Sequence, residues 1–361
     1  MINVTKTFLP PINEYMAQVQ RAYDNVWLTN RGELIKELEH NIAQVLQLRE
    51  ASILCMNNGT IPIQIALKLL AKGGDVITTP FSYVATTSSI LWEACTPIFV
   101  DIHPEYLTID ESKIEAAITP RTTCILATHV FGNPCNIEEI ERIALKHNLK
   151  VIYDAAHSFG VEYDGKSIFE YGHVSTCSFH ATKLFHTGEG GAAFCKDPGL
   201  FHEIFYSHNF GHNGPLDFHG LGINAKISEL QAAMGLAVLP HLEFIIERRK
   251  QVVDFYNNEL NFSHLAKLKI RPLTRWNYSY YPVLFSDEQR LLEVDAELRK
   301  NEITGRRYFY PSLNTLQFID GKTCPVSEDV SKRIMCLPLY PDLNENQLRK
   351  ITSVINAVLN A

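Results

Sequence analysis

Short apolar runs alternate with helical patterns from about residue 33 to about residue 200. Apolar residues near helical spacing, such as Leu34, Leu38 and Ile42, form one stripe of an amphipathic helix. Residues 52–55 read as a buried strand, which a turn separates from a helical pattern over residues 61–71. Later in the chain, Asn136 with Glu139 three residues on is typical of a helix start. Further strand candidates cover residues 76–79, 98–100, 123–128 and 151–153.

Alternation of helices with nearly continuous apolar strands favours an α/β fold of three layers. In such a fold a mostly parallel sheet is covered on both faces. Ligands of these sheets bind beyond the carboxyl ends of the strands. We therefore expect the chemistry in the residues that directly follow each strand.

The pattern changes towards the C-terminus. Residues 225–260 are helical in pattern, with a polar break predicted at 248–250. Residues 278–285 read as an aromatic strand, and helical patterns cover 287–300 and 345–359. We predict a large domain over residues 1–249, including an N-terminal helix, and a smaller C-terminal α+β domain over residues 250–361.

Composition narrows the class of protein. The 361 residues are 46% hydrophobic and carry a net charge of −7, which argues against a general nucleic-acid binder. None of the eight cysteines forms a CxxC pair, so they read as reduced core residues. We see no signal-peptide pattern and no apolar stretch near the roughly 18–20 residues that span a bilayer. We expect a cytoplasmic protein without a membrane or nucleic-acid partner.

The turn at residues 57–60 has the residues of a phosphate site. Gly59 permits a tight turn, and Thr60 offers a hydroxyl beside the free N–H groups of a helix start. A simple helix N-cap explains the same residues. The spacing of a nucleotide P-loop is absent.

Two charged residues follow predicted strands. Asp154 ends the strand at 151–153, and a carboxylate there needs a hydrogen-bonding or cationic partner, such as a protonated pyridine nitrogen. Lys183 lies between a strand and a glycine-rich turn, where burial turns the amine into a nucleophile. A helix-capping acid and a surface lysine are the alternatives. The glycines at 188–191 do not start a helix, so we reject a dinucleotide motif.

Two further features have ordinary explanations. Tyr83 follows the strand at 76–79 and could stack on a flat ring or pack in the core. His208, His212 and His219 are spaced like metal ligands. Glycine and proline interrupt any helix between them, and no cysteine or carboxylate set completes a site, so we expect no metal.

Taken together, these segments resemble the DegT/StrS-type nucleotide-sugar aminotransferases, which have the type I pyridoxal-phosphate transferase fold. The resemblance runs along nearly the whole chain, and the motifs occur in the family's order. They lie at residues 27–32, 58–60, 80–86, 154–157, 178–183 and 222–231.

The resemblance implies pyridoxal 5'-phosphate as the cofactor and a role for each matching residue. Lys183 matches the lysine that holds the cofactor covalently, and Asp154 the carboxylate paired with the pyridine nitrogen. His157 matches the neighbour of the ring hydroxyl, and Tyr83 the aromatic side chain over the ring. The phosphate cradle matches Gly59, Thr60 and Ser178. Asn224 matches a residue that reaches the phosphate from a partner subunit, which implies a homodimer with shared sites.

The resemblance also implies L-glutamate as the amino donor and a nucleotide-linked keto sugar as the acceptor. The run over residues 179–191 is most similar to members that form dTDP-4-amino-4,6-dideoxyglucose from dTDP-4-keto-6-deoxyglucose, a precursor for O-antigen or natural products. The family's Pro-Leu-His near the sugar is replaced here by Pro311-Ser-Leu-Asn314.

Three alternatives stay open. One is amination at C3 of a dTDP-3-keto-6-deoxyhexose. Another is a sugar dehydratase, although those relatives have histidine in place of Lys183. The third is a non-catalytic regulatory protein that binds pyridoxal phosphate, which would typically carry an extra DNA-binding segment.

Overall fold

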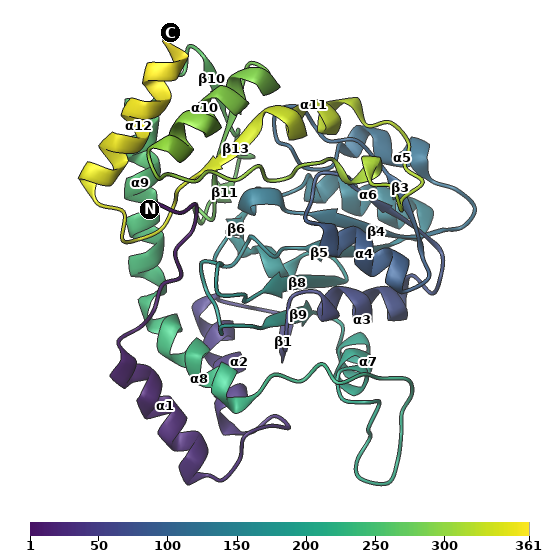
Figure 1. Ribbon diagram of the computed structural model, residues 1–361. Coiled ribbons are helices and arrows are strands. Elements are labelled where there is room, and N and C mark those ends of the chain that lie inside the picture. The colour runs from purple at the N-terminus through teal and green to yellow at the C-terminus, as the bar shows by residue number, and fades with distance from the viewer. Residues whose placement is uncertain (361) are drawn as a thin grey trace.

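A seven-stranded sheet forms the centre of the computed structural model, which describes residues 1–360 (Figure 1). The strands from β8 through β5, β4 and β2 to β3 pair in parallel, whereas β9 pairs antiparallel with both β1 and β8. The predicted mostly parallel sheet is therefore confirmed. In spatial order the strands are β1 (Ser52–Met56), β9 (Gly191–Cys195), β8 (Val174–Ser178), β5 (Lys150–Asp154), β4 (Thr122–Thr128), β2 (Asp75–Thr78) and β3 (Thr96–Phe99).

Helices cover both faces of this sheet, as Figure 1 shows. Alternate strand residues point to opposite faces: Cys55 of β1 joins one apolar cluster and Leu54 the other. The three layers expected from the sequence are thus present. One face packs against α2 (Glu33–Val45), α6 (Ile137–His147) and α8 (Glu229–Val238), and the other against α3 (Ile61–Leu70), α4 (Val84–Trp92) and α7 (Pro198–Ser207).

Local signals placed most of these elements correctly. Before residue 200 the predicted strand and helix ends lie within two residues of their observed positions, and Asn136 caps α6 by accepting a hydrogen bond from the Glu139 N–H. The helical pattern expected from residue 225 begins only at Glu229. The predicted strand at 278–285 begins only at Tyr281, because Tyr278 has a φ of +55°, which no strand residue adopts.

A second, three-stranded sheet and its helices form the C-terminal part, with a separate apolar core. It contains β10 (Leu265–Lys267), β12 (Tyr281–Phe285), β13 (Ile334–Leu337), α10 (Glu288–Lys300), α11 (Pro325–Arg333) and α12 (Glu345–Leu359). Other elements are α1 (Ile12–Asp24), α5 (Ile114–Ala117) and a small sheet of β6 (Glu162–Tyr163), β7 (Lys166–Ser167) and β11 (Thr274–Arg275).

The helical region near residue 250 differs from the expectation. The turn η4 (Leu239–His241) joins α8 to α9 (Leu242–Glu259), and α9 runs through residues 248–250 without a break. Arg249 is buried and donates to the Ser279 carbonyl at 3.0 Å, so the predicted polar break is wrong. The division into domains at residue 249 stays a prediction, and that residue lies inside α9.

The run from Glu229 to Glu259 also corrects the expectation that no apolar stretch is long enough to span a membrane. Among residues 1–360 this continuous run of α8, η4 and α9 is the one helical segment that is long and apolar enough to cross a membrane. However, 56% of its apolar window is buried inside the protein. All eight cysteines are free and buried, as predicted.

Candidate active site

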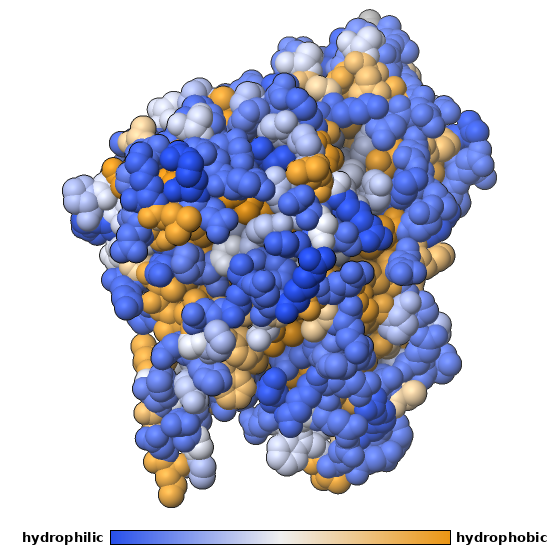
Figure 2. Space-filling view, turned by 180° about the vertical axis from the view of Figure 1, so that it is seen from behind, coloured by the Kyte–Doolittle hydropathy of each residue, from blue (hydrophilic) through white to orange (hydrophobic). Residues whose placement is uncertain are grey.

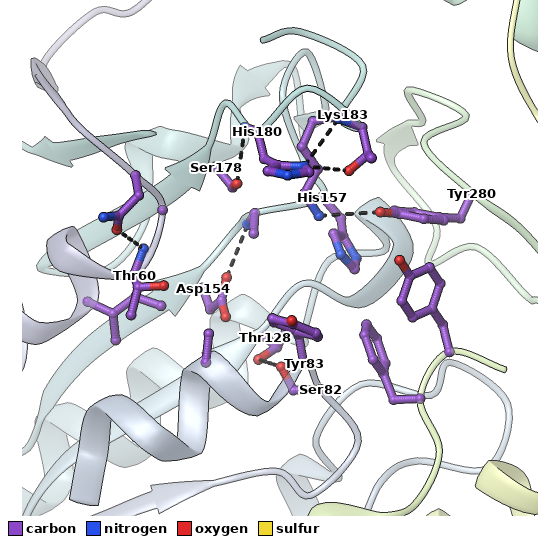
Figure 3. A pocket seen from close by; sticks show the side chains of 18 of the residues that line it. Thr60, Ser82, Tyr83, Thr128, Asp154, His157, Ser178, His180, Lys183 and Tyr280 are labelled. Carbon is purple, nitrogen blue, oxygen red and sulfur yellow. Dashed lines mark hydrogen bonds between the residues drawn. The ribbon is translucent and has the colours of Figure 1, made fainter. Parts of the chain in front are cut away.

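A cavity of about 340 Å³ opens at the carboxyl ends of the parallel strands (Figure 3). Thr128 of β4, Asp154 of β5 and Ser178 of β8 are the last residues of their strands, and all three line it. This is the edge at which the sequence predicted the chemistry. Seven of the eight candidate residues line the cavity: Gly59, Thr60, Tyr83, Asp154, His157, Ser178 and Lys183.

Asp154 is buried, and both of its carboxylate oxygens are held. The Thr86 hydroxyl donates to Oδ2 at 2.7 Å, and the Ala156 N–H donates to Oδ1 at 3.1 Å. Burial raises the pKa of Asp154, and these two hydrogen bonds and the charge of Lys183 oppose that shift. The carboxylate is therefore oriented and poorly solvated, a setting that favours a cationic partner.

Lys183 lies beyond the end of β8, after a turn at residues 179–182. Burial lowers the pKa of Lys183, and the nearby Tyr308 and Asp154 oppose part of that shift. Its amine donates to the Tyr280 hydroxyl at 3.3 Å. A lysine with a lowered pKa holds more of its amine in the neutral, nucleophilic form.

His157 follows Asp154 by three residues and is fixed as one tautomer. Its Nδ1 accepts from the Phe131 N–H at 3.1 Å, so the proton of the neutral ring is on Nε2. Burial lowers the pKa of His157 well below its usual value. The ring lies between Tyr280 and Phe309, with centroid distances of 4.6 and 5.8 Å. His157 therefore presents a neutral N–H donor.

The turn before α3 brings two hydroxyls to the cavity. Thr60 occupies the N-cap position without a side-chain capping bond, because Asn58 accepts from the N–H groups of residues 60 and 61 instead. The side-chain cap of the turn thus comes from Asn58 and not from Thr60, and the N–H groups of residues 60 and 61 are not free, contrary to the expectation. Thr60 and Ser178 both line the cavity. A Cβ on Gly59 would come within 2.6 Å of the Ser178 Cβ, so this close approach requires glycine.

Tyr83 and Asn224 differ in position. Tyr83 lines the cavity and is 54% exposed, so it is not a core residue. Asn224 does not line the cavity of its own chain. Its side-chain oxygen accepts from Lys226 at 2.8 Å, and it lies in the segment between α7 and α8.

The three histidines between residues 208 and 219 make separate contacts. The Nδ1 of His208 bonds to the Phe205 carbonyl, His219 pairs with Glu203 at 2.8 Å, and His212 packs on Phe218. No group of three potential ligands that could hold a metal occurs in the part of the chain that the structure describes.

Several residues of the site were missed from the sequence. Thr86 lies within the motif at residues 80–86, and Tyr280, Arg306, Tyr308 and Phe309 come from the C-terminal part. The sequence signal for these residues was the aromatic run at 306–310, which begins with Arg306. Its guanidinium lies 4.4 Å from the centre of the Tyr308 ring.

Asn314, the last residue of the segment at 311–314, is buried and does not line the cavity. Its side chain donates to Glu328 at 2.7 Å and to the Lys322 carbonyl at 3.0 Å, and it accepts from Ser312. The residue holds the local turn together.

Comparisons with known proteins show what the whole chain is similar to. A dTDP-4-amino-4,6-dideoxy-D-glucose transaminase of Escherichia coli is 38% identical over 98% of both chains. The enzyme of the same name from Shigella dysenteriae is 38% identical over 99% of both chains. The crystal structure of DesI with its TDP-sugar product superposes with a TM-score of 0.93 at 28% identity, covering 99% of this chain and 93% of DesI.

The model of the DegT/DnrJ/EryC1/StrS aminotransferase family matches residues 12–356, nearly the whole chain. Fold, site and relatives thus agree on a sugar aminotransferase. The chain belongs to the DegT/DnrJ/EryC1/StrS aminotransferase family.

Proposed function

We propose that this enzyme holds pyridoxal 5'-phosphate on Lys183 and transfers an amino group from L-glutamate to a dTDP-linked keto sugar. The observation that carries the proposal is one cavity lined by a lysine of lowered pKa and a buried, oriented carboxylate, Asp154. Its volume of about 340 Å³ lies within the ~300–1,000 Å³ typical of small-molecule sites.

The residues fit each part of this cofactor. Asp154 supplies the negative charge that a protonated pyridine nitrogen needs, and His157 offers a neutral N–H to the ring hydroxyl. Thr60 and Ser178 offer hydroxyls to the phosphate at the start of α3, where the helix dipole favours an anion. Tyr83 has an exposed ring that can cover the cofactor ring.

Pyridoxal phosphate, when bound, supplies an electron sink next to the amino nitrogen of the substrate. The protein supplies the proton transfers. The neutral Nζ of Lys183 would take a proton from the α-carbon of the amino donor. It would later deliver a proton to the sugar carbon that receives the amino group. Asp154 would balance the charge of the protonated ring nitrogen, and the Thr86 hydroxyl and the Ala156 N–H hold its carboxylate in one orientation.

For the acceptor, we favour dTDP-4-keto-6-deoxy-D-glucose, which yields dTDP-4-amino-4,6-dideoxy-D-glucose. The names of the two 38% identical relatives support this choice. The alternative is amination at C3 of a dTDP-3-keto-6-deoxyhexose. NMR of the product distinguishes the two, because the chemical shift of a ring carbon changes when it bears nitrogen, which identifies C4 or C3.

We propose that the enzyme is a homodimer in which Asn224 reaches the phosphate in the partner's cavity. Apolar side chains are exposed in two segments of the chain. They are Trp27 and Leu28 after α1, and Leu216, Phe218 and Leu221 between α7 and α8. The segment between α7 and α8 extends away from the sheet in Figure 1, and its tip is orange in Figure 2. Exposed apolar side chains that gather in one segment favour a subunit interface.

A non-catalytic regulatory protein that binds the same cofactor is the alternative from another class. Addition of glutamate distinguishes the two, because only an aminotransferase shifts the visible absorbance of the cofactor and releases 2-oxoglutarate. A cytoplasmic location stays a prediction.

The decisive experiment is reduction of the cofactor-supplied protein with borohydride, followed by peptide mass spectrometry. We expect the adduct on the peptide that contains Lys183, and none after Lys183→Ala. Lys150→Ala is the control, because Lys150 starts β5, at the end opposite Asp154. An adduct elsewhere, or none in the unchanged protein, contradicts the proposal.

A further inference from the structure

The hydroxyl of Tyr280 contacts the amine of Lys183 from the C-terminal part of the chain. Tyr280 directly precedes β12 and is only 5% exposed. Its oxygen accepts from Lys183 Nζ at 3.3 Å, and Figure 3 shows the side chains pointing towards each other. Within residues 1–360 this is the one side-chain hydrogen bond of the Lys183 amine.

The tyrosine ring is held from several sides. It packs against His157 at 4.6 Å and meets the Tyr308 ring edge-on at 5.4 Å. Phe131 lies 6.0 Å away on a third side. The hydroxyl oxygen therefore has a defined position, whereas the lysine has a long, flexible side chain.

The chemical nature of this contact matters for an amine that must exchange protons. A carboxylate partner would stabilise the ammonium form and hold the proton on Nζ. A phenol oxygen accepts an N–H without adding a charge, and burial raises the pKa of Tyr280, which keeps it neutral. The contact can thus orient the amine without fixing its proton.

We propose that Tyr280 is a positioning residue for Lys183, whose N–H it accepts so that the nitrogen lone pair points into the cavity. The inference rests on the proposed function, in which the lysine amine is released and must stay at the reacting carbon. Other titratable or charged groups face this pair. They are Asp154, Tyr308, Cys177 and Tyr83 around Lys183, and Arg249, Arg306 and Cys336 around Tyr280.

Tyr280→Phe tests the role, because it removes the hydroxyl and keeps the ring. Misplacement of a reacting group by about 1 Å lowers a rate about 100-fold, so we expect kcat to fall about 10- to 100-fold. The KM for glutamate should change less than about twofold, since the phenol does not bind the donor. The isotope effect with α-deuterated glutamate should rise, because proton transfer becomes slower relative to the other steps.

The matched control is Tyr281→Phe. Tyr281 is the next residue, but its hydroxyl donates to Asn257 at 2.9 Å and its ring packs on Tyr256 in the C-terminal core. We expect this variant to keep the kcat and the isotope effect of the unchanged enzyme.

A second measurement uses the full chain without cofactor. Reductive methylation of Lys183 at pH 7, followed by peptide mass spectrometry, reports how free and how neutral the amine is. Tyr280→Phe should speed this labelling about fivefold, which corresponds to the loss of one hydrogen bond. Tyr281→Phe should leave the labelling rate unchanged.

Two results would overturn the inference. One is a Tyr280→Phe variant that matches Tyr281→Phe in both measurements. The other is a lower kcat with an unchanged isotope effect and an unchanged labelling rate, which indicates a merely structural role. Failure of the proposed function looks different, because the unchanged protein then lacks a borohydride adduct on Lys183 while labelling still reports the contact.

Discussion

The Thr86 hydroxyl donates to Asp154 Oδ2 at 2.7 Å and so ties α4 to the end of β5. The same Thr86 oxygen lies 2.7 Å from the Ser82 hydroxyl, which in turn accepts from Thr128 at 3.2 Å. A chain of hydroxyls from α4, the turn before α4 and β4 thus supports the buried carboxylate. Asp154 is therefore oriented by the protein before any ligand binds.

Thr86→Val should weaken cofactor binding about tenfold. It removes a hydrogen bond to the carboxylate form and so raises the pKa of Asp154 further, which weakens the attraction to a protonated ring nitrogen. The measurement is the dissociation constant of pyridoxal phosphate by absorbance. Thr87→Val is the control, because the buried Thr87 hydroxyl has no hydrogen-bond partner within residues 1–360. Equal affinity in both variants would count against the role of Thr86.

Gly59→Ala should lower the unfolding free energy by about 1–3 kcal/mol and weaken cofactor binding. The added methyl group would lie 2.6 Å from the Ser178 Cβ, so the turn must move away from β8. Thermal unfolding with and without cofactor measures both effects. In the control Gly220→Ala, the added methyl group meets no atom within 4 Å, so little destabilisation is expected.

His129 should make the protein sensitive to acid. It is fully buried, its Nδ1 accepts from the Cys135 N–H at 3.0 Å, and burial lowers its pKa to about 3. The unfolded chain binds a proton near pH 6.5 that the folded protein cannot take up, so stability falls as the pH drops below that value. Between pH 7 and pH 5 this residue should account for a loss of about 2 kcal/mol.

His129→Asn tests this, because the asparagine oxygen can still accept from the Cys135 N–H. The measurement is the free energy of unfolding in urea, for the cofactor-free protein at pH 7 and at pH 5. The loss of this free energy from pH 7 to pH 5 should be about 2 kcal/mol smaller in the variant than in the unchanged protein. The exposed His264→Asn is the control and should leave the difference unchanged. A His129→Asn variant with the original difference would show that His129 is protonated in the folded state.

Leu216→Glu should weaken the proposed dimer. Leu216 is 94% exposed in a single chain, and a charge there would be buried without a partner in an interface. Light scattering across a concentration series should show more monomer and a loss of activity on dilution. Leu145→Glu is the control, because Leu145 is 77% exposed and lies on α6, outside the segment between α7 and α8. A dimer of unchanged strength would place the interface elsewhere.

Local sequence patterns determined the secondary structure and much of the candidate site of this protein. Apolar periodicity located the strands and helices to within a few residues, because burial on one or two faces imposes a period of 2 or 3.6 on the sequence. The position of Asp154 and Lys183 after predicted strands was enough to place both at one edge of the sheet. The motifs along the chain were enough to identify the family.

Only the tertiary structure decided which distant residues meet. No local pattern shows that β9 is inserted antiparallel between β1 and β8, since strand pairing depends on the packing of the whole sheet. For the same reason the contacts of Thr86 with Asp154, Phe131 with His157 and Tyr280 with Lys183 could not be read from the sequence. Each joins residues at least 26 positions apart, and their geometry is set by the layers that carry them.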